Sequence, residues 1–325
     1  MPTSRAHAPS PPESRPVPVP ERYELSVVVP YRLDLTVSAL RRLSTNVVDV
    51  LTPDGQYVRA LGGAHGPMIV RVTQVRPDAL AVAIEGDASE HARVLALVRR
   101  MLGVDRELTQ FGRAAARMAW LSQLARRMRG VKPPRYPTLW EAFVNAIAFQ
   151  QVSLHAASAI VRRLIVAFGQ PLESEGTSLY TFPSAEQVLG AKDDLLRATG
   201  LSAGKLATLR RAGDGLAAGT LDAAMLEERP SPDVAALLRQ IKGIGPWTAT
   251  VILLRGLGRL DVFPMNDSSV ARNLVLVAGA VPLDVGSILE PLGAQRGMLY
   301  YHLLLARLEA RGEVGRPSSS ADECR

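Results

Sequence analysis

The residues best suited to chemistry lie between Leu237 and Asn273, in the run LLRQIKGIGPWTATVILLRGLGRLDVFPMNDSSVARN. Gly243 and Gly245 are predicted to stop one helix within a turn, and Pro246 suits the first position of the next helix. Two glycines let a backbone approach another surface closely, and the amides at a helix N-terminus bind an anion such as a phosphate group. The alternative interpretation is an ordinary tight turn between two packed helices.

Cysteine and histidine usage excludes several kinds of cofactor chemistry. The single cysteine, Cys324, cannot form an intrachain disulfide, a zinc site of cysteine ligands or an iron–sulfur cluster. The five histidines are scattered without ligand spacing, which argues against a metalloenzyme built on paired histidines. Thirty-eight Lys and Arg against 31 Asp and Glu give a net charge of +7, which favours a polyanionic partner.

The first third of the chain is predicted to be a small α+β domain. Residues 1–22 contain seven prolines and no apolar core of signal-peptide type, so we expect a disordered lead. From Tyr23 to about Gly86, valine-rich alternating runs are separated by the turn signals PDG, GGAHG and RPDA, which predicts antiparallel strands. Helices are expected near 37–43 and over 89–102, so the domain spans residues 23–104.

The remainder is predicted to be helical. Alanine, leucine and arginine recur at a period near 3.6 from Gly103 onward, and no strand-like run is evident. The fold class is therefore α+β, with the antiparallel-sheet domain followed by an all-helical domain over 105–311 and a polar tail over 312–325. No uninterrupted apolar run is long enough to span a bilayer. Helices are expected over 112–129, 138–149, 153–168, 184–190, 192–199, 203–217, 233–241, 246–255, 268–278, 284–290 and 296–311.

The spacing of Trp247 and Asp267 carries a family resemblance. Asp267 follows Trp247 by twenty positions and opens a further helix after the apolar run DVFPMN. Hairpin, spacing and approach together resemble the helix-hairpin-helix superfamily of DNA glycosylases. The segment PPRYPTLWEAFVNAIAFQQVSLHAASAIVRRL and the strand-rich first domain extend the resemblance over about residues 23–311, and they are most similar to the alkylation-type 3-methyladenine DNA glycosylase II branch.

The resemblance implies that Asp267 is catalytic. Hydrolysis of an N-glycosidic bond builds positive charge on the sugar, and a nearby carboxylate stabilises that centre or activates water. The alternative interpretation is an N-cap for the helix that follows, and both roles can coexist. Asp261, in the same loop, lacks the family spacing and is expected to fix the loop.

The resemblance also implies a glycosylase that leaves the DNA strand intact. Trp247 stands where the strand-cleaving branch places a lysine nucleophile, and neither Lys242 nor Lys205 occupies that position. Trp247 is expected to form a wall of the base pocket, or alternatively to be a buried aromatic, and Tyr300 and Tyr301 with His302 are candidates for the same pocket. Val251 and Gln295 replace aromatic residues that relatives carry there, which leaves the substrate range open.

The DNA-binding residues are likewise carried over from the family. Phosphate is expected on the backbone amides of Gly243, Gly245 and Thr248, and the wedge that fills the gap of the flipped base is expected at Gln151, for which a helix cap is the alternative. Further phosphate contacts are expected in the acid-free stretch from Leu108 to Trp140, at Lys132 and Arg135, and at Arg296. No cofactor is required. A structural sodium or potassium ion on the carbonyls of Arg239, Ile241 and Ile244 is implied by the resemblance alone.

The sequence therefore predicts a monofunctional glycosylase that releases alkylated purines from duplex DNA and so begins base excision repair. A glycosylase for deaminated bases such as hypoxanthine or uracil stays open, as does a non-catalytic protein that only binds damaged DNA. We expect a monomer, without membrane association, in the bacterial cytosol or in a eukaryotic nucleus.

Overall fold

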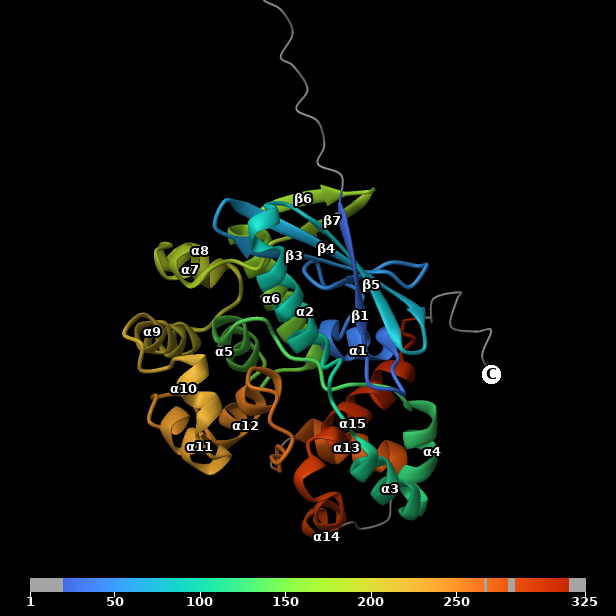
Figure 1. Cartoon of the computed structure of the whole chain (residues 1–325). Coiled ribbons are helices and arrows are strands. Elements are labelled where there is room, and N and C mark those ends of the chain that lie inside the picture. Colours follow the sequence, from blue (N-terminus) through green and yellow to red (C-terminus); the bar gives the residue numbers. More distant parts are fainter. Residues whose placement is uncertain (1–19, 266–267, 280–283, 316–325) are drawn as a thin grey trace, which may run out of the picture.

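The structure is a computed structural model that describes residues 20–265, 268–279 and 284–315. The N-terminal part is a five-stranded antiparallel sheet with the strand order β1-β5-β4-β3-β2 (Figure 1). Its strands are β1 (Glu21–Ser26), β2 (Val50–Leu51), β3 (Tyr57–Gly63), β4 (Gly66–Arg76) and β5 (Ala79–Glu85).

Period-two alternation in the central strands creates the first hydrophobic core. Val70 and Val72 of β4 and Val82 of β5 are completely buried, as alternation along a strand places them on one face. Helix α2 (His91–Leu102), which follows the short 3₁₀ helix η1 (Ala88–Glu90), covers this face and ends at Gly103 in the left-handed conformation. Helix α1 (Leu33–Arg41) packs against the same core and is buried along most of its length.

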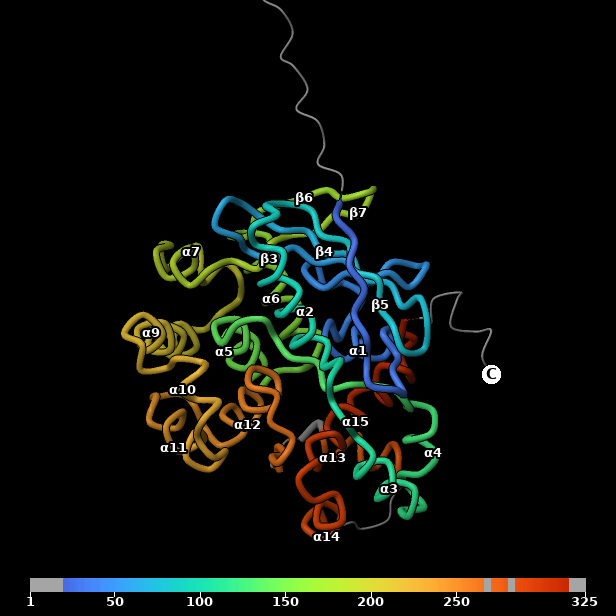
Figure 2. Tube along the Cα trace, viewed as in Figure 1, coloured from blue at the N-terminus to red at the C-terminus, as the bar shows by residue number. Residues whose placement is uncertain are grey.

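The rest of the chain is predominantly helical and forms two further hydrophobic cores. One core joins α5, α6 and the helices up to α12, and the other joins α1, α3, α4 and α13–α15 (Figure 2). The helices are α3 (Thr109–Arg117), α4 (Ala119–Arg127), α5 (Leu139–Ala148), α6 (Leu154–Phe168), α7 (Ala185–Leu189), α8 (Asp193–Ala198), α9 (Ala203–Ala217), α10 (Ala223–Glu228), α11 (Ser231–Arg239), α12 (Pro246–Arg255), α13 (Ser268–Ala278), α14 (Val285–Leu289), the 3₁₀ helix η2 (Glu290–Gln295) and α15 (Met298–Glu309).

A buried ionic cluster joins the sheet to α5. Arg59 of β3 donates to Asp49 and to Glu141 of α5, both at 2.5 Å, and all three side chains are buried. Burial raises the pKa of Glu141 to about 7, against the attraction of Arg59. Another buried arginine, Arg255 at the end of α12, donates to the carbonyls of the last turn of α1. The hairpin helix is thereby fixed to the N-terminal part.

The α+β fold class is confirmed, with local corrections, one of which is that α10 (Ala223–Glu228) was not among the expected helices. The prediction that no strand follows Gly103 is wrong, because β6 (Pro171–Ser174) and β7 (Thr177–Tyr180) form a hairpin. Its two-residue turn places Glu175 and Gly176 at positive φ, the turn that suits right-twisted strands, and Leu179 packs on β3. The helix expected over 112–129 is divided at Met118, whose backbone is extended.

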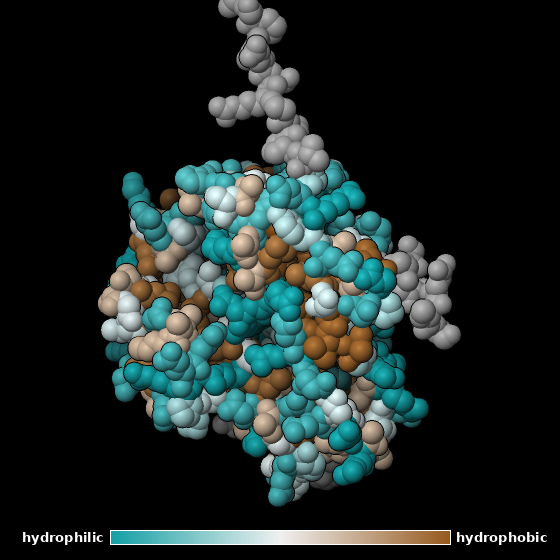
Figure 3. Space-filling model, in the orientation of Figure 1, coloured by the Kyte–Doolittle hydropathy of each residue, from teal (hydrophilic) through white to brown (hydrophobic). Residues whose placement is uncertain are grey.

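Within the described ranges, none of the helices is long and apolar enough to cross a membrane. Hydrophilic residues cover most of the face drawn in Figure 3, with smaller hydrophobic patches between them.

Candidate active site

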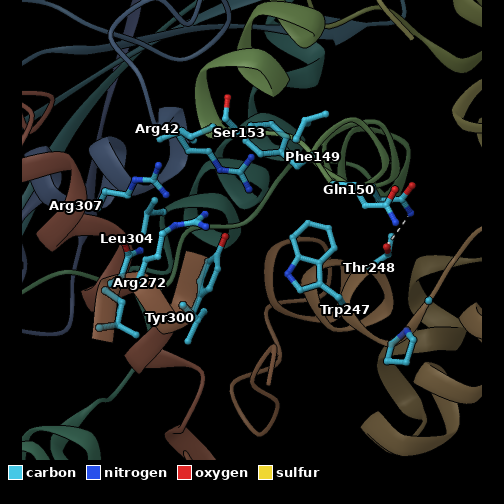
Figure 4. Close-up of a pocket in the computed structure, with 18 of the residues that line it drawn as sticks. Arg42, Phe149, Gln150, Ser153, Trp247, Thr248, Arg272, Tyr300, Leu304 and Arg307 are labelled. Carbon is cyan, nitrogen blue, oxygen red and sulfur yellow. Dashed lines mark hydrogen bonds between the residues drawn. The ribbon is translucent and has the colours of Figure 1, made fainter. Parts of the chain in front are cut away.

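A cavity of about 770 Å³ lies between the two helical cores. One side is formed by the α5–α6 loop and the hairpin before α12, and the other by α13 and α15 (Figure 4). The residue that follows α1 completes the lining. The residues that line the cavity are Arg42, Phe149, Gln150, Gln151, Val152, Ser153, Leu154, Gly243, Gly245, Pro246, Trp247, Thr248, Val270, Arg272, Asn273, Tyr300, Leu303, Leu304 and Arg307.

The two glycines of the hairpin are suited to their positions for different physical reasons. Gly243 has φ +103°, and a Cβ there would collide with the hydroxyl of Thr208 on α9, so this glycine is required by the fold. Gly245 is the N-cap of α12 in an ordinary extended conformation, and a Cβ there would meet nothing within 4 Å. Gly245 lines the cavity, so a second molecule can approach its backbone closely.

Helix α12 starts as the sequence predicts, with Pro246 at its first position. The first helical hydrogen bond is donated by Ala249 to the carbonyl of Gly245 at 3.0 Å. The amides that precede Ala249, including that of Thr248, are therefore outside the intrahelical ladder, as at every helix N-terminus. Together with the positive end of the helix dipole they form a site for an anion.

The hairpin is tied to the α5–α6 loop by Gln150. Its side-chain nitrogen donates to the carbonyl of Gly243 at 2.9 Å and to the hydroxyl of Thr248 at 2.8 Å. The next residue, Gln151, is exposed at the cavity and has φ +56°, a conformation that few residues other than glycine adopt. Such strain persists where the surrounding structure imposes it, and it is common at functional sites.

Aromatic rings line the interior of the cavity. Figure 4 shows the indole of Trp247 and the ring of Tyr300 on opposite sides, with Phe149 at the α5–α6 end. Trp247 is half-buried, and Tyr300 is 9% exposed. Flat aromatic walls on two sides of a cavity suit a flat ligand that stacks on them.

Three arginines from three separate elements also reach the cavity: Arg42 after α1, Arg272 of α13 and Arg307 of α15. The guanidinium carbon of Arg42 lies 3.8 Å from the centre of the Phe149 ring. The described part of the lining includes no Asp or Glu. The described lining thus carries three positive charges and no negative one, which suits an anionic ligand.

Asp267 lies outside the described residues. Helix α13 begins at the next residue, Ser268, and its Val270, Arg272 and Asn273 line the cavity. Asp261 of the same loop accepts a hydrogen bond from Ser231 at 2.9 Å, in agreement with its expected role in fixing the loop.

Comparison with known proteins places this architecture. No protein-family model matches the chain. It is 31% identical over 217 residues to the probable bifunctional transcriptional activator/DNA repair enzyme AlkA of Mycobacterium tuberculosis; these residues are 66% of this chain and 42% of that relative. It is 22% identical over 264 residues to a DNA-3-methyladenine glycosylase of Bacillus subtilis, which covers 80% of this chain and 84% of the relative.

Solved structures agree in fold. The 3-methyladenine DNA-glycosylase from Archaeoglobus fulgidus superposes with a TM-score of 0.75 at 23% identity and covers 89% of this chain and 99% of that chain. The chain thus resembles helix-hairpin-helix DNA glycosylases in sequence and in fold. The 8-oxoguanine glycosylase/lyase of Clostridium acetobutylicum, solved in complex with double-stranded DNA, has the same fold. It superposes with a TM-score of 0.68 at 14% identity and covers 90% of this chain and 99% of that chain. The chain spans less than half the length of the Mycobacterium relative that it matches.

Two of the expected DNA contacts are wrong. Lys132 is 2% exposed, and its ammonium donates to the carbonyl of Arg106 at 2.8 Å. Arg135 is 9% exposed and donates to Glu227 at 3.0 Å and to the carbonyl of Leu257 at 2.9 Å. Burial lowers the pKa of both side chains. These cations stabilise the interior and do not present themselves to a phosphate.

Part of the expected base pocket is also wrong. Tyr301 is completely buried, and its hydroxyl donates to the carbonyl of Pro134 at 3.1 Å, away from the cavity. His302 is buried against Phe111 of α3. Val251 lies in the hydrophobic core of α12, and Gln295 bonds the backbone of α3 and of residue 107. Substitutions at these last two positions therefore do not change the lining of the cavity.

Three further residues considered in the sequence analysis lie outside the lining of the cavity. Arg296 is half-buried, and its Nε donates to the carbonyl of Gly293 at 2.8 Å. Lys205 donates to the carbonyl of Ala148 at 2.9 Å, and Lys242 is outside the cavity lining. In the part of the chain that the structure describes, no cluster of three or more metal-ligating side chains is found.

Sequence reasoning missed Phe149 and the three arginines of the cavity. Arg42 lies in the N-terminal part, more than 200 residues before the hairpin. No local signal marked Arg42, because the helix expected near 37–43 includes this residue, whereas α1 ends at Arg41. Its meeting with α5 and α12 depends on tertiary packing.

Proposed function

We propose that the chain is a monofunctional DNA glycosylase that hydrolyses the N-glycosidic bond of alkylated purines, of the 3-methyladenine type, in duplex DNA. The observation that carries the proposal is the aromatic cavity that opens beside the hairpin, between Trp247 and Tyr300. An enzyme that acts on a base inside a duplex must first extrude it into such a pocket. The names of the relatives from Mycobacterium and Bacillus support the same activity.

The hairpin would hold the DNA backbone during this extrusion. The amides at the start of α12 supply donors for a phosphate, and Gly245 offers no side chain to obstruct it. Gln151, exposed and strained at the edge of the cavity, would enter the space that the extruded base leaves. The carbonyls of Arg239, Ile241 and Ile244 would hold a sodium or potassium ion. That of Ile241 already accepts one bond at 2.9 Å from the amide of Ile244, which leaves it a second lone pair.

Asp267 would supply the catalytic charge. The C1′ carbon of the sugar becomes positive as the bond to the base breaks, and an ionised carboxylate stabilises that charge and orients the attacking water. Position 267 directly precedes α13, whose first two turns line the cavity. An alkylated purine already carries positive charge, so the base leaves without an acid to protonate it, and its electron-poor ring stacks favourably on an indole.

Water is the expected nucleophile because an amine is missing from the described lining of the cavity. Trp247 occupies the position from which strand-cleaving relatives attack, and Lys205 is directed to the carbonyl of Ala148. The product would be an abasic site in an intact strand, released by a monomer bound to duplex DNA.

The test uses duplex DNA treated with dimethyl sulfate. Chromatography of the supernatant is expected to detect free methylated purine, and the strand should break only after alkali. Borohydride added during turnover should trap no covalent protein–DNA complex, since no imine forms. Absence of any released base would contradict the proposal, and a crosslink that Lys205→Met or Lys242→Met removes would contradict hydrolysis by water.

A further inference from the structure

Arg42 lines the candidate base pocket, and one of its side-chain donors has no acceptor among the described residues. Its side chain lines the cavity although the residue is only 5% exposed. Its NH1 nitrogen is buried and finds no hydrogen-bond acceptor among the described residues. A buried guanidinium donor without an acceptor is costly to maintain, and a folded protein seldom leaves one without a function.

The backbone at Arg42 is strained as well. Its φ of +64° and ψ of −72°, with the amide of Leu43 donating to the carbonyl of Arg41 at 2.9 Å, form the rarer kind of γ-turn. Three residues other than glycine have positive φ in the described part of the chain, and two of them, Arg42 and Gln151, line this cavity. The third, Glu175, lies in the turn of the β6–β7 hairpin, where that conformation is ordinary.

Two sets of contacts hold Arg42 in place before any ligand arrives, one at the end of α1 and one at the guanidinium. Arg255 of α12 donates to the carbonyls of Ala39 and Leu40 at 3.0 and 2.8 Å, which holds the end of α1 against the hairpin helix. The ring of Phe149 supports one face of the Arg42 guanidinium at 3.8 Å (Figure 4). A guanidinium stacked in this way directs its N–H groups sideways, in the plane of the group. Arg42 is therefore a preorganised donor.

We propose that Arg42 is a specificity-determining residue that donates a hydrogen bond to a carbonyl oxygen of the flipped base. This inference rests on the proposed function. A guanidinium has five donors and no acceptor, so it pairs with a carbonyl oxygen and opposes an amino group. The pocket would therefore favour 7-methylguanine, which carries an oxygen at C6, over 3-methyladenine, which carries an amino group there. Both lesions are positively charged in DNA, so the charge of Arg42 affects them similarly.

A backbone phosphate is the other oxygen that could accept this bond. Phosphates remain at the solvated surface of a protein–DNA complex, and the start of α12 already supplies donors for them at the rim. Arg42 is 95% covered and lies against a pocket aromatic, which favours a ligand that enters the cavity. The base is that ligand.

The test compares both lesions in one reaction. Dimethyl sulfate places 7-methylguanine and 3-methyladenine in the same duplex, and single-turnover release of each base is followed by chromatography. Arg42→Met keeps a long side chain over Phe149 but has no donor. We expect it to lower the rate for 7-methylguanine about tenfold relative to that for 3-methyladenine, since the hydrogen bond from the guanidinium to the base oxygen is lost in a buried site. Arg42→Lys keeps a donor, so its ratio of the 7-methylguanine rate to the 3-methyladenine rate should lie between those of wild type and Arg42→Met. Arg272→Met, which removes an exposed cation of the same cavity, should leave this ratio unchanged.

Affinity for a duplex with a tetrahydrofuran abasic site shows whether Arg42 donates to the base or to a backbone phosphate. Because that DNA lacks the base, a base contact predicts equal affinity for wild type and Arg42→Met. Loss of affinity together with an equal decrease of both rates would assign Arg42 to phosphate and overturn the inference. An unchanged ratio of the two rates in a folded variant would also overturn it. If the methionine variant does not fold, Arg42→Leu, which also has no donor, is measured in its place. Wild type that releases neither base would instead contradict the proposed function.

Discussion

The side-chain amide of Gln150 donates to the hydroxyl of Thr248 at 2.8 Å, and so joins the α5–α6 loop to the hairpin helix. The same nitrogen reaches the carbonyl of Gly243 at 2.9 Å. The proposed wedge residue, Gln151, and the proposed phosphate site are thereby joined on the same side of the cavity. In this arrangement, movement of one is coupled to movement of the other.

Gln150→Leu should weaken binding to abasic-site DNA. The variant removes two hydrogen bonds, each worth about 1 kcal/mol, so a decrease in affinity of about 30-fold is expected. Thr248→Val removes only the hydroxyl and is the matched partner for a double-mutant cycle on the dissociation constant. A coupling of about 1 kcal/mol is expected between the two positions, and additive effects would mean that the contact does not organise the DNA site.

The hairpin could be predicted from sequence because its signals are local. Two glycines and a proline within four residues specify a helix end and a helix start, and the structure places α12 from Pro246 as expected. The sheet likewise followed from valine alternation and turn residues. The β6–β7 hairpin was missed because each strand is only four residues long, and its support comes from β3, which lies more than 100 residues earlier.

Burial of charge could not be predicted from the linear pattern. The acid-free stretch around Lys132 predicts a DNA-facing surface. The groups that accept hydrogen bonds from Lys132 and Arg135 lie on other segments of the chain. Tyr300 and Tyr301 are adjacent in sequence but about 100° apart around α15, so only one of them reaches the cavity. Arg42 required knowledge of where α1 ends in space.

The two hairpin glycines should respond differently to alanine. Gly243→Ala places a Cβ at φ +103° against Thr208, and we expect a loss of about 3 kcal/mol in the free energy of unfolding. Gly245→Ala meets no atom within 4 Å, so its stability should match wild type while its affinity for DNA falls. Denaturant unfolding and binding to abasic-site DNA measure the two effects. Wild-type affinity of Gly245→Ala would show that no phosphate approaches this backbone.

His302 should make stability decrease at acidic pH. Burial lowers its pKa to about 4, although a hydrogen bond with the carbonyl of Met298 at 2.9 Å opposes the shift. The unfolded chain binds this proton near pH 6.5 and the folded chain only near pH 4, so the contribution is complete above pH 6.5 and is lost as the pH falls to 4.

His302→Gln isolates this effect, because glutamine does not titrate and retains a hydrogen-bond donor. The difference in unfolding free energy between wild type and variant should fall by about 3 kcal/mol between pH 7 and pH 4. Denaturant titrations at several pH values measure it. A difference that is constant over this range would mean that His302 titrates normally in the folded protein.

Base release by Asp267→Asn tests the central claim of a carboxylate-assisted hydrolysis most directly. Asparagine retains a side chain that can cap α13 but lacks the charge that the sugar cation requires. In single-turnover reactions on methylated duplex DNA, the account predicts a decrease in the rate of at least about 100-fold, with affinity for abasic-site DNA retained. Release of methylated purine at the wild-type rate would contradict it, and would leave Asp267 with the role of a helix cap alone.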